Sequence, residues 1–390
     1  MELFFDFAYD SLNKVQEELC GDKVEVVKAD DSTIIVLADG LGSGVKANIL
    51  ATMTTKIAGT MLKEGASIDE TIETIAKTLP VCNLRKLAYS TFVIMKISKA
   101  GQVHLIEYDN PPVFMIRKNR PFPLRKKEKD IHGKRILESV FQLEEGDLLT
   151  LVSDGVVHAG VGRALNLGWQ WENVEEYLVR RSKNEKTAKG IANNLIDTCY
   201  YLYEKKPGDD TTVVTLKARK PQTLDLFSGP PVLPERDPEI VGAFMKGRGK
   251  KVVCGGTAAN IISRELGKEV EVLIGTGTES IPPRAQIPGI DFVTEGVITL
   301  SHVVENIIDY RTKRVLKPMG KQEEKLNGAD LLTRVFLEDC THLNFHVGKA
   351  INPAHQNPDL PKDLSIKLRV LEQLKEQLEA LGKEVTIHYY

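Results

Sequence analysis

The stretch Ile34-Ile35-Val36-Leu37-Ala38-Asp39-Gly40-Leu41-Gly42-Ser43-Gly44 decides the fold of the first half of this chain. Its four leading apolar residues are typical of a buried strand, and the Asp-Gly pair with the glycines that follow ends that strand in a tight turn. Another apolar run, Val24-Glu25-Val26-Val27, precedes it across the turn Ala29-Asp30-Asp31-Ser32. We therefore predict a hairpin in which Asp22 and Asp39 lie at the same end of neighbouring strands.

Two later turns repeat this pattern of an acid at the end of an apolar run. Ser153-Asp154-Gly155 follows the run 148–152, and Gly208-Asp209-Asp210-Thr211-Thr212 precedes the run 213–216. Carboxylates are costly to bury without a partner, so acids gathered at one edge of a sheet need a cation. Hard oxygen ligands suit Mg²⁺ or Mn²⁺ rather than zinc. Asp-Gly pairs are also common hairpin residues, so each turn taken alone could be only a turn.

Length, charge and cysteine content limit the other possibilities. The 390 residues exceed the roughly 250 to 300 at which single cores stop growing, so we predict two domains. A net charge of -2 gives no basic field for nucleic acid. The five cysteines show no paired spacing, the start lacks the features of a signal peptide, and no apolar run approaches the roughly 20 residues of a membrane span. We expect a cytoplasmic protein without a membrane anchor.

The rest of the first half mixes strands and helices. Apolar residues recur every four positions after the first turn, which predicts a helix with this face against a core. These residues are Val45, Ile49, Met53, Ile57 and Met61. Ser67-Ile68-Asp69-Glu70 fits a capping box that opens a second helix. With strand-like runs at 90–97, 103–108, 113–117 and 148–152 and a helix around 186–203, the order favours an α+β fold, a mainly antiparallel sheet with helices on its outer faces.

The composition changes near residue 220. Prolines cluster there, which favours an extended linker. They are Pro221, Pro230, Pro231, Pro234 and Pro238. We therefore predict one domain over residues 1–219, a proline-rich linker over residues 220–240, and a second domain over residues 241–390. Because this last part alternates strand-like and helix-like segments, we predict that it is a smaller α/β domain.

Together and in this order, the three acidic turns resemble the signature of the protein phosphatase 2C superfamily. The resemblance is to its bacterial branch, typified by the sporulation phosphatase SpoIIE and the stress-response phosphatases, and covers roughly residues 1–220. It implies an antiparallel β-sandwich flanked by helices. It also implies that Asp39 bridges two metal ions, with the Gly40 carbonyl as a further ligand. Asp154 and Asp209 would complete one side of the site, and Asp22 matches the early acidic position of the family.

The resemblance implies a metal-dependent serine/threonine protein phosphatase with two Mn²⁺ or Mg²⁺ ions, in which Asp39, Asp154 and Asp209 are the catalytic residues. Its substrate would be a phosphoserine or phosphothreonine regulatory protein, of the STAS or anti-sigma antagonist type. Paired cations can activate a water for in-line attack on phosphorus, so no protein nucleophile is required. Larger eukaryotic relatives carry a histidine after the first Asp-Gly, where this chain has Leu41, so a histidine general acid is not available at that turn.

The alternative is a regulatory binding protein with little turnover. In that interpretation the carboxy-terminal domain senses a ligand or mediates homodimerisation. Gly255-Gly256-Thr257 before a helix could cradle a phosphate or form a tight turn. Cys340, His342, Asn344 and His346 alternate, so one strand face could bind a metal or simply be polar. The basic stretch 117–127 could steer an acidic phosphoprotein or form a solvated hairpin tip.

Overall fold

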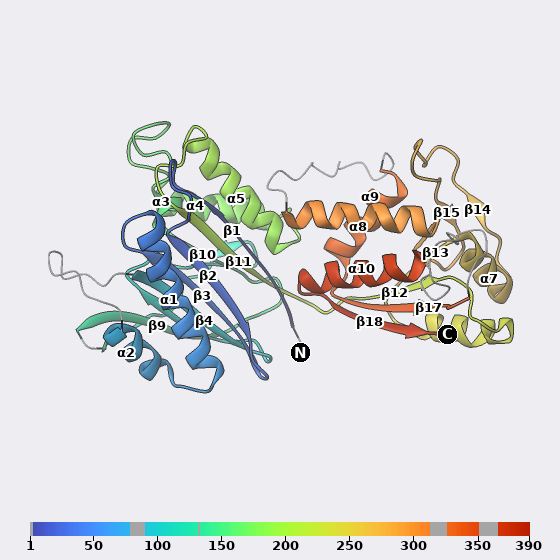
Figure 1. The fold of residues 1–390 in the computed structure, drawn as a ribbon, viewed down its shortest axis with the longest axis horizontal. Helices are drawn as coiled ribbons and strands as arrows, with labels where there is room; N and C mark the ends of the chain where they lie inside the picture. Colours follow the sequence, from blue (N-terminus) through green and yellow to red (C-terminus); the bar gives the residue numbers. More distant parts are fainter. Residues whose placement is uncertain (1–2, 79–89, 132, 313–325, 351–365) are drawn as a thin grey trace. The chain divides into compact units, whose positions relative to one another are not determined.

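The structure is a computed structural model that describes residues 3–78, 90–131, 133–312, 326–350 and 366–390. The chain divides into two compact units, Met1–Lys220 and Pro221–Tyr390, which Figure 1 shows as separate assemblies of strands and helices. Each unit has its own sheets and core, so each is described by itself.

The first unit is built on two antiparallel sheets. One sheet has the order β1 (Phe4–Leu12), β11 (Thr211–Arg219), β10 (Leu148–Val152), β6 (Phe114–Arg117), β7 (Arg120–Pro121). The other has the order β2 (Asp22–Lys28), β3 (Ser32–Gly40), β4 (Ser90–Ser98), β5 (Gln102–Tyr108), β9 (Lys134–Gln142), β8 (Lys127–Ile131). A shared core joins them, in which Leu37 of β3 and Leu151 of β10 are fully buried. The predicted antiparallel β-sandwich is confirmed.

Helices cover both outer faces of this sandwich. α1 (Gly44–Lys63) and α2 (Ile68–Thr78) pack on the β3 sheet, and α3 (Asp154–Val157), α4 (Trp171–Ser182) and α5 (Ala188–Leu202) pack on the other. Residues 34–38 of β3 are all apolar, and both faces of this part of the strand are buried: Ile35 contacts the facing sheet, whereas Ile34 and Val36 contact the helices. Asp39 follows these buried residues, near the carboxy-terminal end of the strand.

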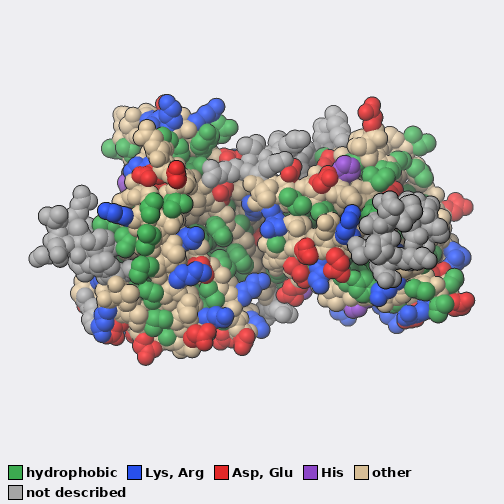
Figure 2. Space-filling view, in the orientation of Figure 1, with side chains coloured by type: hydrophobic (Ala, Val, Ile, Leu, Met, Phe, Trp, Pro, Cys, Tyr) green, Lys and Arg blue, Asp and Glu red, His purple; other side chains and the backbone are tan. Residues whose placement is uncertain are grey.

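The structure confirms the first predicted helix but corrects its buried face. Val45, Ile49 and Met53 are 61%, 52% and 39% exposed, and Figure 2 shows hydrophobic side chains at the surface over α1. The buried face instead carries mostly small side chains: Ala47, Ala51, Thr54, Thr55, Ala58 and Leu62. A Cβ atom at Gly59 would lie 2.9 Å from the side chain of Val27. The helix lies so close to the sheet that larger residues do not fit between them, which a count of apolar spacing does not reveal.

The second unit contains a mainly parallel sheet of order β14 (Glu271–Val272), β15 (Ala285–Gln286), β16 (Phe292–Thr294), β13 (Lys250–Cys254), β12 (Thr223–Ser228), β17 (His342–Val347), β18 (Glu384–Tyr389). All pairs from β16 to β18 are parallel, and β14 and β15 add an antiparallel ribbon at one edge. From the central β12 the chain proceeds outward through β13 and β16 and then crosses to β17 and β18. This is a doubly wound α/β arrangement, as the alternating pattern predicts.

Helices cover the two faces of this sheet. η1 (Pro234–Arg236), α6 (Asp237–Lys246) and α7 (Gly256–Leu266) lie on the side of one core cluster. α8 (Val297–Thr312), α9 (Gly328–Arg334), a π-helical turn (Val335–Asp339) and α10 (Ile366–Ala380) lie on the side of the other. No helix among the described residues is long and apolar enough to span a bilayer.

The expected linker over residues 220–240 is wrong. This segment contains β12, the central strand of the second sheet, followed by η1 and the start of α6. The prolines do not extend the chain: Pro234 and Pro238 occupy first-turn helix positions, where a missing N–H costs nothing. The five prolines lie on either side of β12, a strand of six residues, and their density hides this strand in the sequence.

Candidate active site

A cavity of about 200 Å³ opens at one end of the sandwich. It is lined by the end of β3, the start of β4, the first residue of α3 and the turn before β11. These residues are Asp39, Gly40, Leu41, Gly42, Ser90, Thr91, Asp154, Asp209 and Asp210. Three acidic turns that are more than fifty residues apart in sequence thus meet at one cavity.

The β3 sheet holds Asp39 in place by register. Asp22 on β2 and Thr91 on β4 are its direct partners on either side. The Ser90 hydroxyl donates to the Asp39 carbonyl oxygen at 2.9 Å. The next residue, Gly40, packs against the first turn of α1, where a Cβ atom would lie 2.0 Å from the Ala47 carbonyl oxygen. Glycine is therefore required at position 40 by this close approach of two backbones.

The other two acidic turns are fastened to each other. The Thr212 amide donates to the Ser153 hydroxyl oxygen at 2.8 Å, and the Ser153 amide donates to the Thr212 carbonyl oxygen at 3.0 Å. A Cβ atom at Gly155 would lie 2.1 Å from the Asp210 carbonyl oxygen. These contacts fix Asp154, at the start of α3, beside the turn that carries Asp209 and Asp210.

Asp22 lies behind the cavity rather than on its wall. It is 4% exposed, and neither of its carboxylate oxygens makes a hydrogen bond of ordinary geometry to a described residue. Burial raises the pKa of Asp22 to about 7, although the nearby hydroxyls of Ser153 and Thr212 act to lower it. A buried carboxylate without a partner is costly, so the chemistry of this residue suits a site beside a cation.

The cavity concentrates negative charge. Burial, together with the neighbouring Asp22, Asp154, Asp209 and Asp210, raises the pKa of Asp39 to about 9. The pKa of Asp209 is also raised, mainly by burial and next by Asp154, while Lys14 lowers it. A divalent cation would remove this repulsion, and carboxylate and carbonyl oxygens are the donors that Mg²⁺ and Mn²⁺ prefer.

The donor chemistry and the unpartnered oxygens of Asp22 therefore fit divalent cations. In the ranges that the structure describes, however, no group of three or more His, Cys, Asp and Glu side chains is arranged to hold a metal ion. The acids line the cavity wall and do not converge on one point.

Three polar residues of the cavity wall lie outside the predicted site residues: Ser90 and Thr91, which sequence reasoning missed, and Asp210, which it quoted in the third acidic turn but did not select. Ser90 and Thr91 open β4, and their position opposite Asp39 depends on a strand pairing between segments fifty residues apart. Asp210 lies on the wall beside Asp209, and its Oδ1 accepts from the Lys14 amide at 3.0 Å. Its place in the tandem Asp209-Asp210 was the available signal.

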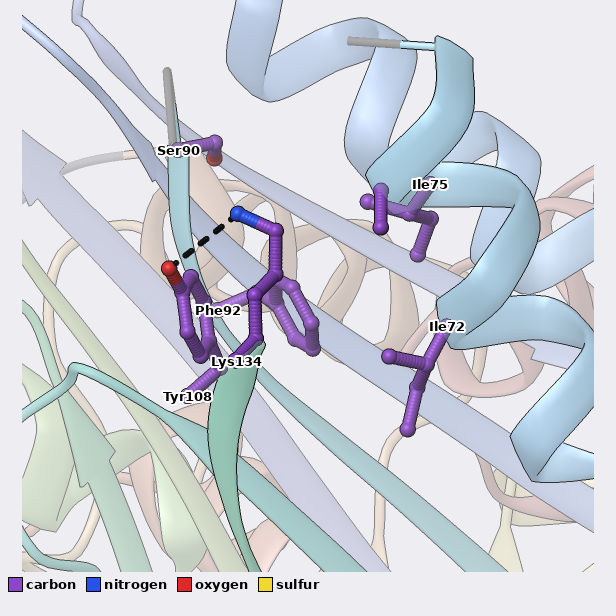
Figure 3. A pocket seen from close by; sticks show the side chains of 7 residues that line it. Ile72, Ile75, Ser90, Phe92, Tyr108 and Lys134 are labelled. Atoms are coloured by element: carbon purple, nitrogen blue, oxygen red, sulfur yellow. Dashed lines mark hydrogen bonds between the residues drawn. The ribbon is translucent and has the colours of Figure 1, made fainter. Parts of the chain in front are cut away.

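A small second cavity borders Ser90 from the other side (Figure 3). It is enclosed by Ile72 and Ile75 of α2, Phe92 of β4, Tyr108 of β5 and Lys134 of β9. The Lys134 ammonium lies 5.0 Å from the Tyr108 ring centre and donates to its hydroxyl at 3.3 Å. Its volume of about 10 Å³ is no more than a single water needs, so it is a packing gap between helix and sheet.

The glycine motif and the alternating polar motif of the second half both make packing contacts. Gly255 has φ +117° and packs against the backbone of Gly296, with 3.2 Å between a Cβ at Gly296 and the Gly255 Cα, so this motif is a tight turn. Asn344 and His346 contact the buried Asp225, whereas Cys340 is buried in the core on the α10 side. The four alternating residues therefore do not share one face.

The basic stretch of the first half is partly neutralised. Arg117 pairs with Asp147 at 2.6 Å and with Glu144 at 2.9 Å, and Lys126 pairs with Glu107 at 2.7 Å. The Arg117 pairs hold the end of β6 to the turn before β10, and the Lys126 pair joins the segment after β7 to β5.

Residues 29–219 match a family model described as Stage II sporulation protein E (SpoIIE). A comparison with curated proteins gave no match. Among solved structures, the chain is similar to the phosphatase domain with a regulatory fragment of SpoIIE from Bacillus subtilis, at 21% identity and a TM-score of 0.47, covering 56% of this chain and 64% of that one.

It is also similar to the RsbU and RsbW domains of Rv1364c from Mycobacterium tuberculosis, at 17% identity and a TM-score of 0.46, covering 57% of this chain and 62% of that one. A third similar structure is RsbX in complex with magnesium, at 20% identity and a TM-score of 0.40, covering 55% of this chain and 95% of that one. The chain thus spans less than two thirds of the SpoIIE and Rv1364c chains. By this family match, residues 29–219 of the chain form a SpoIIE-type domain.

Proposed function

We propose that the chain is a metal-dependent phosphoprotein phosphatase whose cavity takes two divalent cations, Mn²⁺ or Mg²⁺. The observation that carries this proposal is the meeting of Asp39, Asp154 and Asp209 at one cavity, with Asp22 buried behind it and without a hydrogen bond of ordinary geometry to a described residue. An antiparallel sandwich has no structural use for four acids at one end, since each raises the cost of ionising the others.

The roles of the residues follow from their positions. Asp39 and the Gly40 carbonyl would help to hold the ions from the end of β3. Asp154 and Asp209 would hold the ions from the opposite wall, and Asp22 would supply charge from behind Asp39. When bound, the cations would supply Lewis-acid chemistry for attack of water on phosphorus. Because Leu41 stands after the first Asp-Gly, no histidine at that position can protonate the leaving oxygen, and water would do so.

Lys14 is suited to neutralise the phosphate of the substrate. Its ammonium lies 3.9 Å from Oδ1 of Asp209, and its side chain is 38% exposed. Its backbone amide donates to Asp210 at 3.0 Å, which holds this residue at the cavity. A flexible cation at this place could turn from the carboxylate to an incoming phosphate.

The substrate we propose is a phosphoserine or phosphothreonine regulatory protein of the STAS or anti-sigma antagonist type, acting in the cytoplasm. The support is the SpoIIE family match and, for the compartment, that Cys20, Cys199, Cys254 and Cys340 are all free thiols. The second unit would then be a regulatory or dimerisation domain.

The test is hydrolysis of para-nitrophenyl phosphate and of a phosphoserine protein by the full chain with Mn²⁺, Mg²⁺ or EDTA. Asp39→Asn should lower the metal-dependent rate by about a thousandfold or more, since loss of a metal-binding carboxylate removes several kcal/mol of transition-state stabilisation. The matched control is Asp30→Asn, an exposed aspartate at the opposite end of the same hairpin, which should keep the wild-type rate. An Asp39→Asn protein that folds and retains the wild-type rate would refute the proposed site.

A second candidate function is a regulatory binding protein with little turnover. The observation that favours it is that no described group of side chains is arranged to hold a metal ion. Calorimetric titration with Mn²⁺ separates the two: uptake of two ions with hydrolysis supports the phosphatase, whereas uptake without hydrolysis of either substrate supports the binding protein.

A further inference from the structure

The strand β18 forms one edge of the sheet in the second unit, and its described neighbour is β17 (Figure 1). Natural proteins protect such edges by short strands, charged side chains or proline. The opposite edge strand, β14, has two residues, and four of the five residues of the edge strand β8 are charged. β18 has six residues and contains no lysine, arginine or proline. Among the described residues, only β17 pairs with β18, and the outer edge of β18 has no strand beside it.

The backbone of β18 uses alternate residues to pair with β17. The Glu384 amide donates to the Thr341 carbonyl oxygen at 3.0 Å, and the Tyr390 amide donates to the Val347 carbonyl oxygen at 2.9 Å. In a parallel ladder the residues between such positions direct their N–H and C=O groups to the other side. The backbone groups of Val385 and Ile387 therefore face the edge.

The side chains of β18 are self-complementary about Thr386. On one face, Val385 and Ile387 are partly buried against the core under α10. On the other face, Glu384, Thr386 and His388 are exposed. If a second copy of β18 pairs in antiparallel fashion with Thr386 opposite Thr386, Glu384 lies opposite His388 and Val385 opposite Ile387.

The same register suits the backbone. Val385 and Ile387 then form hydrogen-bonded pairs through the groups that face the edge, whereas Thr386 lies in a non-hydrogen-bonded pair, where side chains come closest. On the polar face, Glu384 of each copy lies opposite His388 of the other. On the other face, Val385 and Ile387 continue the apolar core from one copy to the next. A shift of the register by two residues would lose the pairing of Glu384 with His388.

We propose that β18 is a self-association surface, through which two copies of the chain form a symmetric dimer with Thr386 on the twofold axis and one continuous sheet. The occupant is a second copy because the strand complements itself in charge, in apolar pattern and in backbone direction. This proposal uses only residues of the second unit and stands whether or not the first unit is a phosphatase.

The test is the mass of the full chain in solution by size-exclusion chromatography with light scattering. The wild type should have twice the chain mass of 43.4 kDa. Thr386→Lys and Thr386→Glu each place like charges face to face on the axis, so each should halve the measured mass. An equal mixture of the two variants should return to the mass of the dimer, because lysine then faces glutamate.

Gln373→Lys is the matched control, since this exposed residue of α10 gains the same charge away from the strand edge and should leave the dimer intact. Hydrogen exchange gives a second readout: the Val385 and Ile387 amides should exchange slowly in the wild type and rapidly in Thr386→Lys. A monomeric wild type, a dimeric Thr386→Lys, or folded variants whose mixture stays monomeric would each overturn the proposal.

Discussion

The two units of this chain each bury an aspartate, and the two aspartates differ in their partners. Asp225 in β12 is 1% exposed and receives hydrogen bonds from Lys251 at 2.6 Å and from Asn344 at 3.0 Å. Burial alone would raise the pKa of Asp225, but the bonds from His346, Lys251 and Asn344 lower it to about 2. Asp22 is 4% exposed and has no such partner, and its pKa is raised.

This difference separates a structural carboxylate from one kept for a ligand. A buried charge that its own fold neutralises contributes to that fold, whereas one that the fold leaves unpaired costs stability until something binds. In the second unit the partners of Asp225 come from β13 and β17, so the charge helps to hold three strands together. In the first unit the neighbours of Asp22 are the hydroxyls of Ser153 and Thr212 and other acids, and none of these carries a positive charge.

The largest effect should come from removing Asp225. Asp225→Ala leaves Lys251 buried without its carboxylate, and we expect a loss of about 3 to 5 kcal/mol in the free energy of unfolding of the second unit. Urea unfolding of the full chain measures this loss, and metal-dependent phosphatase activity should be unchanged. The double variant Asp225→Leu with Lys251→Met should recover most of the stability, because both charges are then absent. A loss below about 1 kcal/mol in the single variant would contradict a structural role.

The same aspartate predicts the acid sensitivity of the second unit. Its pKa falls from 3.8 in a free aspartate to about 2 in the fold, so the folded state binds the proton less tightly than the unfolded state. The stabilisation is therefore complete above pH 3.8 and is lost as the pH falls towards 2. Asp225→Asn should flatten the stability of the second unit over this interval.

Two glycines, one in each unit, should give the next largest effect on stability when they are replaced. A Cβ atom would lie 2.0 Å from the Ala47 carbonyl oxygen at Gly40 and 2.0 Å from the Pro230 carbonyl oxygen at Gly348. Alanine at either position should cost about 1 to 3 kcal/mol, because a backbone must move. Gly40→Ala should also abolish hydrolysis, whereas Gly348→Ala should not. Equal activity of the two variants, at matched loss of stability in urea, would show that position 40 serves packing alone.

Sequence reasoning found what depends on local pattern and missed what depends on tertiary distance. Asp39, Asp154 and Asp209 were accessible because each ends or begins an apolar run, and strand ends of a sandwich meet at one edge. Thr91 was not accessible, because its place opposite Asp39 requires a pairing that no local pattern shows. The buried face of α1 was assigned by apolar spacing, but the closeness of the sheet selects alanine and threonine. The prolines around β12 resembled a linker because they are close together in sequence, although two of the five, Pro234 and Pro238, lie in first turns of helices.

Asp22→Asn tests the other half of the comparison with a smaller effect. The substitution removes an unpaired buried charge without changing shape, so without metal the unfolding free energy of the first unit should stay equal or rise by about 1 kcal/mol. Saturating Mn²⁺ should raise the melting temperature of the wild type and raise that of the variant less, because ligand binding to the folded state stabilises it in proportion to affinity. A variant that is destabilised without metal would show that Asp22 has a structural partner.

The smallest effect comes from a lysine. Two lysines, one in each unit, differ in the same way as the two aspartates. Lys251 is buried against Asp225, whereas Lys14 lies 38% exposed beside Asp209. An exposed charge is worth about 0.2 to 1 kcal/mol, so Lys14→Ala should lower kcat/KM for a phosphoprotein by up to about fivefold, mainly through KM. Lys14→Arg should retain the rate, and Lys63→Ala, an exposed lysine at the end of α1, should have no effect. The effect of Lys14→Ala should shrink as ionic strength rises, because salt screens exposed charges. A loss that falls on kcat and does not change with salt would show that Lys14 stabilises the Asp209 turn. The cations alone would then neutralise the phosphate of the substrate.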